Sequence, residues 1–227
     1  MCASRILLLE EPGLLDNTGH LLYRDGLNRG RGRLEPDGPA WDVPGEALFP
    51  SGCAALYRRA MIDEIGTYDP EFFAYGDDTD IGLRGRLAGW RCVYVPGAVV
   101  RHHYSKTAGS YSRFKAFHVE RNRVWIAVKY FPLRHLLASP FWTVARFVLQ
   151  AWGAMTGRGA AGKFAREDSR AALIVVLVRA YASALAGLPL MWRERRLMRP
   201  IRRVGAGEFE RWLREFGISA REIALKD

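Results

Sequence analysis

The first 130 residues alternate short apolar runs with glycine and proline, a pattern typical of short strands and helices joined by turns. Strands are predicted at residues 5–9, 53–57, 90–95 and 99–102. Helices are predicted at residues 58–65, 79–88 and 114–130. Gly66 and Gly89 follow the first two helices as C-terminal caps, and Pro96 is expected to end the third strand. This order of elements predicts an α/β fold.

Residues 24–50 contain many glycine, proline and arginine residues and show no sustained period. We therefore predict a long loop in this part of the chain. Loops of such length inside a compact domain are usually functional, often as lids or binding loops.

From Leu136 onward the pattern is helical and amphipathic, and residues 171–191 are the candidate membrane span. Nine strongly apolar residues in this stretch favour insertion by about 4 kcal/mol, whereas Arg179 near its middle opposes insertion by about 3 kcal/mol. Pro189 and two small residues add to the cost, so the balance is near zero. A helix lying in the membrane interface is therefore expected. The alternative is that these helices pack on the first part of the chain or on a partner subunit.

The net charge of +10 is concentrated in the second part of the chain. Residues 1–132 hold 17 Lys and Arg against 16 Asp and Glu, whereas residues 133–227 hold 17 against 8. The basic residues alternate with long apolar runs and form no recognisable nucleic-acid motif. Basic and apolar residues together favour an anionic membrane surface, and not a nucleic acid, as the partner.

The three cysteines, Cys2, Cys53 and Cys92, are widely spaced and odd in number. They fit neither a disulfide framework nor a zinc site, which indicates a reducing compartment. The N-terminal apolar run is short and is followed at once by two glutamates, so no signal peptide is predicted.

The densest cluster of chemically active side chains lies between residues 72 and 103. Asp77, Asp78 and Asp80 fall within four positions, after a loop with aromatic residues and glycine and before a predicted helix. His102 and His103 follow one strand later. Carboxylates at a helix start, with imidazoles one strand away, suit an enzyme that removes a proton beside a metal-bound phosphate.

Each of these residues also has a structural interpretation. Asp77 or Asp78 can cap the helix, and Asp80 can pair with Arg84 four residues later. The two histidines can be ordinary surface residues. Taken one at a time, the residues favour this interpretation, and the surrounding sequence changes the balance.

Several short motifs occur in a fixed order around this cluster. They are Asn17-Thr18-Gly19, Gly30-Arg31-Gly32-Arg33, Tyr75-Gly76-Asp77-Asp78, Leu83-Arg84, Gly89-Trp90, Val93-Tyr94-Val95-Pro96, His102 and Glu120-Arg121-Asn122-Arg123. Over residues 16–132 the chain closely resembles the acceptor-side half of family 2 glycosyltransferases, particularly the bacterial rhamnosyltransferase-like branch. One departure is Asp77, where the family usually has glutamate, although a carboxylate is retained.

The resemblance implies a partial glycosyltransferase-A fold, which is a Rossmann-like mixed sheet with flanking helices, followed by a C-terminal amphipathic helical segment. It makes Asp78 the general base, with Asp77 beside it expected to raise its proton affinity. His102 matches a histidine that approaches the divalent metal, Mn²⁺ or Mg²⁺, on the donor diphosphate. Arg84 and Trp90 match positions near the diphosphate or the acceptor, although a core aromatic is an equal alternative for Trp90. Asp77, Asp78 and His102 are expected to converge on one rim of the sheet.

The resemblance begins in the second half of the family's catalytic domain. The valine-rich first strand, the Asp-x-Ser-like loop and the metal-binding Asp-x-Asp of the nucleotide-binding half have no counterpart. We therefore expect residues 1–132 to be the acceptor-side part of the catalytic domain and residues 133–227 a basic, membrane-proximal helical segment. The donor-binding half would be lost by truncation or supplied by a complementing polypeptide.

These features predict a portion of an inverting, metal-assisted glycosyltransferase at the cytoplasmic face of the cell membrane. Its donor is expected to be a nucleotide sugar and its acceptor a bacterial glycan or lipid-linked glycan, with little activity without the missing half. One alternative is a catalytically inactive interaction or membrane-tethering module derived from the same family. A second alternative, based on charge alone, is a basic nucleic-acid-binding protein.

Overall fold

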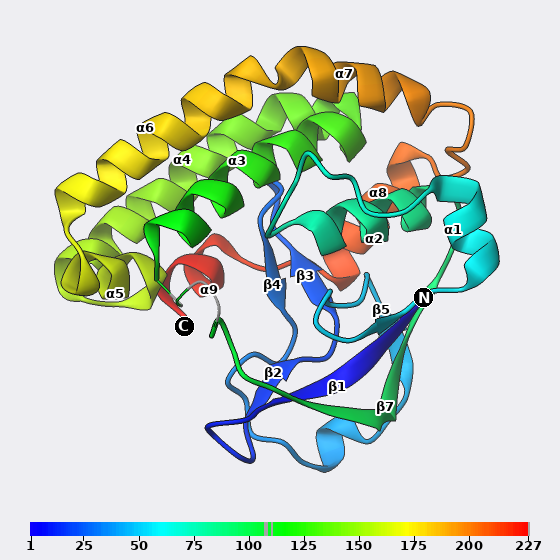
Figure 1. Ribbon diagram of the computed structural model, residues 1–227, viewed down its shortest axis with the longest axis horizontal. Coiled ribbons are helices and arrows are strands. Elements are labelled where there is room, and N and C mark those ends of the chain that lie inside the picture. Colours follow the sequence, from blue (N-terminus) through cyan, green and yellow to red (C-terminus); the bar gives the residue numbers. More distant parts are fainter. Residues whose placement is uncertain (107–108, 110, 227) are drawn as a thin grey trace.

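The computed structural model describes residues 1–106, 109 and 111–226, and places a small curled sheet against a layer of long helices (Figure 1). In this part of the chain the main sheet consists of β1 (Cys2–Leu8), β2 (Leu15–Asn17), β5 (Gly45–Ala47), β6 (Ala55–Leu56) and β7 (Cys92–His102). A second sheet pairs β3 (His20–Leu22) with β4 (Asn28–Gly30), and η1 (Pro39–Trp41) is a short 3-10 helix. The predicted α/β class, a mixed sheet followed by helices, is confirmed.

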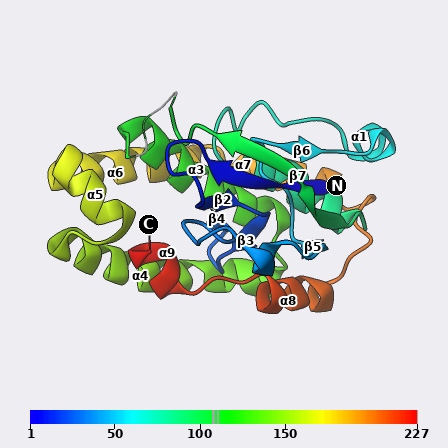
Figure 2. The same cartoon turned by 90° about the horizontal axis from the view of Figure 1, so that it is seen from below.

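β1 is the centre of the main sheet, and its pairing decides which side chains meet at one end. It runs parallel to β7 and antiparallel to β2, so that Leu8 lies opposite His102 and Ile6 lies opposite Asn17. The β1–β2 register shifts next to Ile6, and Asp16 falls in this irregularity. Asp16 and His102 therefore flank the same end of β1 from its two sides. Figure 2 shows β1 and β7 side by side.

Two short helices lie between β6 and β7 in the chain, and they confirm two predicted helices. α1 (Arg59–Ile65) is followed by Gly66, whose φ of 80° is the left-handed conformation that suits a C-terminal cap. α2 (Asp77–Leu87) begins two residues earlier than predicted, because Gly76 adopts a φ of 92° and turns the preceding loop directly into the helix. Asp77 and Asp78 are thus the first two residues of α2.

Two predictions about irregular regions are wrong. β7 does not end at Pro96 but continues to His102. The register of the β1–β7 pair shifts between Ser4 and Arg5, opposite this proline, so the missing N–H interrupts no regular ladder. The predicted loop over residues 24–50 contains β4 and β5, because pairing with β3 and β7 supplies hydrogen bonds that the local pattern does not reveal.

The remainder of the chain is helical, as predicted. The helices are α3 (Arg113–Tyr130), α4 (Leu133–Thr156), α5 (Gly159–Glu167), α6 (Arg170–Ala186), α7 (Leu188–Leu197), α8 (Ala206–Glu215) and α9 (Ala220–Leu225). α3 packs against α2, α6 and α7 in the middle of the layer (Figure 1). One hydrophobic core joins Phe72 and Trp125 to Met191 and Trp212. The helices after residue 132 therefore pack on the first part of the chain.

The apolar stretch at residues 171–191 is divided between α6 and α7 at Gly187. Within the described residues, no single helix is long and apolar enough to cross a membrane. α5 and α6 together have the length and composition of a span, but a bend of 116° separates them. α4 and α6 nevertheless expose large apolar side chains, among them Phe141, Val148, Ile174 and Val178.

Candidate active site

The loop before α2 has a backbone conformation that residues other than glycine rarely adopt. Phe73 and Tyr75 have φ values of 59° and 58°, in the left-handed region. Asn122 of α3 fixes this loop, because its Nδ2 lies 2.9 Å from the carbonyl oxygens of Phe72 and Ala74 and 2.6 Å from that of Tyr75. Such conformations cost about 1–3 kcal/mol each and persist only where the surroundings hold them. Asn122 thereby sets the point at which α2 begins.

The Asp78 carboxylate is held by groups from distant parts of the chain. Its Oδ2 accepts a hydrogen bond from the Gly52 N–H at 3.1 Å and lies 3.2 Å from His20 Nε2, while its Oδ1 accepts from the Thr79 N–H at 2.7 Å. Burial raises the pKa of Asp78, but the interactions with His20 and the two backbone N–H groups outweigh burial and hold the pKa below its ordinary value. Asp78 is therefore ionised at neutral pH, with 16% of its side chain exposed.

Asp77 differs from Asp78 in its proton affinity. Burial raises the pKa of Asp77, and the neighbouring Asp78 charge raises the pKa further. The expected rise in the proton affinity of Asp78 is not found, because its pKa lies below the ordinary value. Asp78 keeps its charge because it has the better hydrogen-bond partners, and the repulsion between the two groups appears at Asp77.

A second carboxylate–imidazole pair lies at the end of β1. His102 Nδ1 is 2.7 Å from Asp16 Oδ2, and the other oxygen of Asp16 pairs with Arg33. Asp16 is buried, so these contacts fix the direction of the His102 ring. When Nδ1–H donates to the carboxylate, Nε2 carries the lone pair that can bind a ligand.

Two cations surround Tyr104 beside this pair. The Arg33 guanidinium carbon lies 3.6 Å from the centre of the Tyr104 ring, and Lys115 Nζ lies 4.4 Å from the same centre and 2.7 Å from the hydroxyl oxygen. Burial raises the pKa of Tyr104, but the charges of Lys115 and Arg33 outweigh burial and lower the pKa. The region next to His102 is therefore electropositive.

His20 connects the two carboxylate–imidazole pairs. Its Nε2 lies 3.2 Å from Nδ2 of Asn17, the residue that follows Asp16. A continuous line of contacts thus runs from Asp78 through His20 and β2 to His102. Asp78 and His102 thus contact neighbouring short strands, β3 and β2, through different partners, and their convergence on one rim stays a prediction.

Arg84 and Trp90 lie away from this region. Arg84 donates to two backbone carbonyl oxygens at the end of α1, at 2.8 and 2.7 Å, and pairs with Asp80 at 2.7 Å. The Trp90 indole N–H donates to Glu64 Oε2 at 2.8 Å. Trp90 lies beyond the far end of α2, whose 11 residues span about 16 Å. The contacts of both residues are structural, and they do not match the expected place near the diphosphate or acceptor.

Several contributors to the site, among them His20, Lys115 and Gly52, were not predicted from the sequence. His20 directly follows the Asn17-Thr18-Gly19 motif, which is a signal present in the sequence. Lys115 lies in the predicted helix without a motif of its own. Gly52 contributes only its backbone N–H, so no side chain indicates its role.

The expected metal has one oriented ligand in this region, His102. Across residues 1–106, 109 and 111–226, no three His, Cys, Asp or Glu side chains come together in a way that could hold a metal ion. The protein side chains described here therefore do not form a complete metal site. An imidazole nitrogen such as His102 Nε2 suits Mn²⁺ better than Mg²⁺, which prefers oxygen ligands, and the remaining ligands would come from the substrate.

Comparison with known proteins gives a family for this region. Residues 39–126 match the family described as glycosyltransferase like family 2. N-acetylglucosaminyl-diphospho-decaprenol L-rhamnosyltransferases from two strains of Mycobacterium tuberculosis, CDC 1551 / Oshkosh and H37Rv, are 42% identical over 59 residues. That match covers 26% of this chain and 19% of each relative, so the chain matches about a fifth of the length of these proteins.

Residues 39–126 are thus similar to a family of glycosyltransferases, a similarity that indicates sugar transfer in general terms. The matched residues include Asp78 and His102, whereas Asp16, His20 and Arg33 precede them. The comparisons do not support the expectation that the nucleotide-binding half has been lost by truncation.

Proposed function

We propose that this chain transfers a sugar from a nucleotide-sugar donor to an acceptor hydroxyl group, with Asp78 as the general base and with inversion at the anomeric carbon. The observation that carries the proposal is an ionised, oriented carboxylate at the first turn of α2, within the residues that match the glycosyltransferase family. The matched segment is short relative to the known proteins, so the activity of the whole molecule is part of the proposal.

A carboxylate base must be ionised and correctly directed before the acceptor arrives. Gly52 and His20 hold one oxygen of Asp78, and the exposed part of the side chain lies within reach of solvent and substrate. As the acceptor oxygen attacks the anomeric carbon, Asp78 takes its proton and the bond to the diphosphate breaks. One direct displacement inverts the configuration. General bases of this kind commonly contribute about 10²–10⁴ in rate.

The departing diphosphate needs positive charge. Lys115 and Arg33, which contact the Tyr104 ring beside His102, are the residues proposed to supply such charge. Part of the Arg33 charge is balanced by Asp16, so Lys115 is the stronger candidate for contact with the leaving group.

A divalent cation, Mn²⁺ or Mg²⁺, remains part of the proposal, and it would neutralise charge on the diphosphate when bound. His102 Nε2 is the protein atom directed to hold it. The contact of His102 with Asp16 fixes the ring for this purpose and raises the basicity of the ligating nitrogen.

The acceptor is proposed to be a bacterial glycan or lipid-linked glycan. Its support is the partial match to a rhamnosyltransferase whose acceptor is named as a diphospho-decaprenol-linked N-acetylglucosamine. The exposed apolar side chains of α4 and α6, with the basic character after residue 132, support a peripheral position on the cytoplasmic side of an anionic membrane.

Transfer from a panel of nucleotide sugars to a polyprenyl-diphosphate-linked N-acetylglucosamine tests the proposal with the full chain. We expect one donor to give Mg²⁺- or Mn²⁺-stimulated product, and Asp78→Asn to abolish product without loss of fold. Asp63→Asn is a matched control, because Asp63 is an exposed carboxylate on α1 that pairs only with Arg59 among its described ion pairs. Equal activity of the Asp78 variant and this control would overturn the proposal.

A further inference from the structure

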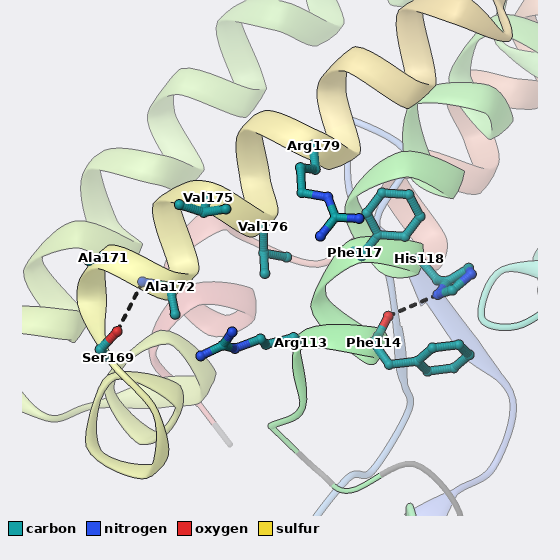
Figure 3. A pocket seen from close by; sticks show the side chains of 10 residues that line it. All are labelled: Arg113, Phe114, Phe117, His118, Ser169, Ala171, Ala172, Val175, Val176 and Arg179. Carbon is teal, nitrogen blue, oxygen red and sulfur yellow. Dashed lines mark hydrogen bonds between the residues drawn. The ribbon is translucent and has the colours of Figure 1, made fainter.

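A pocket of about 510 Å³ opens between α3 and α6, and we call it the α3–α6 groove. Its walls are apolar: Phe114 and Phe117 come from α3, and Ala172, Val175 and Val176 come from α6. Figure 3 shows these side chains on the two helices, together with Arg113 and Arg179. A groove between helices with apolar walls is better suited to a hydrocarbon chain than to a polar ligand.

The two arginines at the groove differ in their ion pairing. Arg113 pairs with Asp168, with Nη2 2.7 Å from Oδ1. Arg179 is exposed and makes no ion pair with any residue that the structure describes. The groove therefore combines apolar walls with one uncompensated cation, a combination that complements a hydrocarbon chain attached to a phosphate.

The groove adjoins the candidate active site through a cluster of aromatic rings. Phe114 lines the groove, and its ring centre lies 6.2 Å from those of both Phe73 and Tyr75. Tyr75 is two residues before Asp77, in the loop that Asn122 holds. The Phe114 ring thus lies between the groove and the loop that leads into α2.

On its other side the groove is continuous with the exposed face of α6. Val175 lines the groove and is 56% exposed, and its neighbours Ile174 and Val178 are 62% and 64% exposed. Exposed apolar side chains beside an open groove would allow a hydrocarbon chain to enter from a membrane without crossing a polar surface.

We propose that the α3–α6 groove binds the proximal part of the hydrocarbon chain of a membrane-embedded, lipid-linked acceptor, with Arg179 beside its phosphate and the sugar directed past Phe114 toward Asp78. The inference rests on the proposed function for its placement of the sugar, and it narrows the acceptor from glycans in general to lipid diphosphates. The groove orients the acceptor and takes no part in proton transfer.

Direct binding tests the groove without turnover. Calorimetric titration of the full chain with farnesyl diphosphate, an isoprenoid probe, is compared with titration by inorganic diphosphate. We expect farnesyl diphosphate to bind at least tenfold more tightly, because only it can fill the apolar walls. A third titration uses dodecyl phosphate. Equal affinity for dodecyl phosphate and farnesyl diphosphate would indicate that the groove accepts any alkyl chain, whereas tighter binding of farnesyl diphosphate would indicate a preference for isoprenoid diphosphates.

Substitutions on α6 test the apolar wall of the groove and its arginine separately. Ala172→Phe fills the groove and is expected to weaken farnesyl diphosphate binding at least tenfold while leaving inorganic diphosphate unchanged. Ala182→Phe, on the exposed face of the same helix, is the matched control and should bind as the wild type does. Arg179→Gln should weaken both probes about equally, whereas Arg193→Gln on α7 should weaken neither.

Equal effects of Ala172→Phe and Ala182→Phe, or equal affinity for farnesyl diphosphate and inorganic diphosphate, would overturn the inference. Thermal melts of each variant establish that the fold is intact. Asp78→Asn serves to separate the two proposals, because it should abolish transfer but bind farnesyl diphosphate normally. A chain that binds this probe without any transfer would contradict the proposed function alone, and transfer that is insensitive to Ala172→Phe would contradict the groove alone.

Discussion

Asp78 and Asp80 lie two residues apart in the first turn of α2, yet the fold gives them opposite environments. Asp80 is completely buried and contacts two cations, Arg84 at 2.7 Å and Lys129 at 2.6 Å, as well as the Tyr130 hydroxyl. Asp78 has an imidazole and backbone N–H groups as partners and remains partly exposed.

The difference shows which carboxylate is able to exchange a proton with a ligand. A buried carboxylate that pairs with two cations contributes to packing, and its loss leaves uncompensated charge. A carboxylate with one imidazole partner and an open side can accept a proton and return it. The same residue type in the same helical turn thus serves packing at one position and, as proposed, chemistry at the other.

The largest expected effect is that of Asp78→Asn on transfer. The substitution keeps the size of the side chain but removes the proton acceptor, so the rate should fall by about 10²–10⁴. The melting temperature should change little. Initial rates and thermal melts of the purified full chain measure both. An active Asp78→Asn protein together with an inactive but folded Asp80→Asn protein would reverse the assignment of the two carboxylates.

Asp80→Asn should act mainly on stability. It leaves Arg84 and Lys129 buried without their shared carboxylate, although Lys129 keeps Asp69 at 2.7 Å, so we expect a loss of about 3 kcal/mol in the free energy of unfolding. Urea unfolding followed by circular dichroism measures the loss. The exposed Asp63→Asn should change stability by less than about 0.5 kcal/mol. If Asp80→Asn lowered the free energy of unfolding no more than Asp63→Asn does, Asp80 would not have the structural role assigned to it.

Asn122→Ala should loosen the loop that positions both carboxylates. It removes the donor for three carbonyl oxygens of residues 72–75, with an expected cost of about 1–3 kcal/mol in stability. Transfer should fall through a lower kcat, since the base is displaced. Asn122→Asp keeps the shape without the N–H donors and should behave as the alanine variant does. A fully active aspartate variant would show that these hydrogen bonds do not position the base.

The pH dependence of transfer tells Asp78 from Asp77. A base acts only when ionised, and the pKa of Asp78 is held below its ordinary value by His20 and backbone N–H groups against the effect of burial. Activity should therefore persist as the pH falls to about 4, the ordinary value of an aspartate, and be lost only below it. If activity were instead lost at a pH above the ordinary range of carboxyl groups, the base would be Asp77, because burial and the Asp78 charge raise the pKa of Asp77.

The smallest expected effects concern charges outside the site. Arg193 and Arg196 are exposed on α7, and replacing each with glutamine should weaken binding to phosphatidylglycerol vesicles by about 1 kcal/mol. Binding should also weaken as salt rises. Arg59→Gln on α1 is the control, because Arg59 already pairs with Asp63. Flotation of vesicles at low and high salt measures the effect, and equal losses for all three arginines would argue against a membrane face on the helical layer.

The sequence alone determined the elements whose causes are local. Gly66 has the conformational freedom that ends α1, and the helix before Pro132 formed as predicted. The pairing of Asp80 with Arg84 also follows from helical spacing and was confirmed. The order of motifs from Asn17 to Arg123 indicated the family that the comparison found over residues 39–126.

The tertiary structure decided what depends on contacts between distant residues. Pro96 is inside a strand because β1 shifts register opposite it, which no local pattern can show. The pKa of Asp78 is below its ordinary value because β3 brings His20 to it and Gly52 directs an N–H at it, and these contacts outweigh the effect of burial. Adjacent charges are visible in a sequence, whereas the groups that solvate them are chosen by the fold.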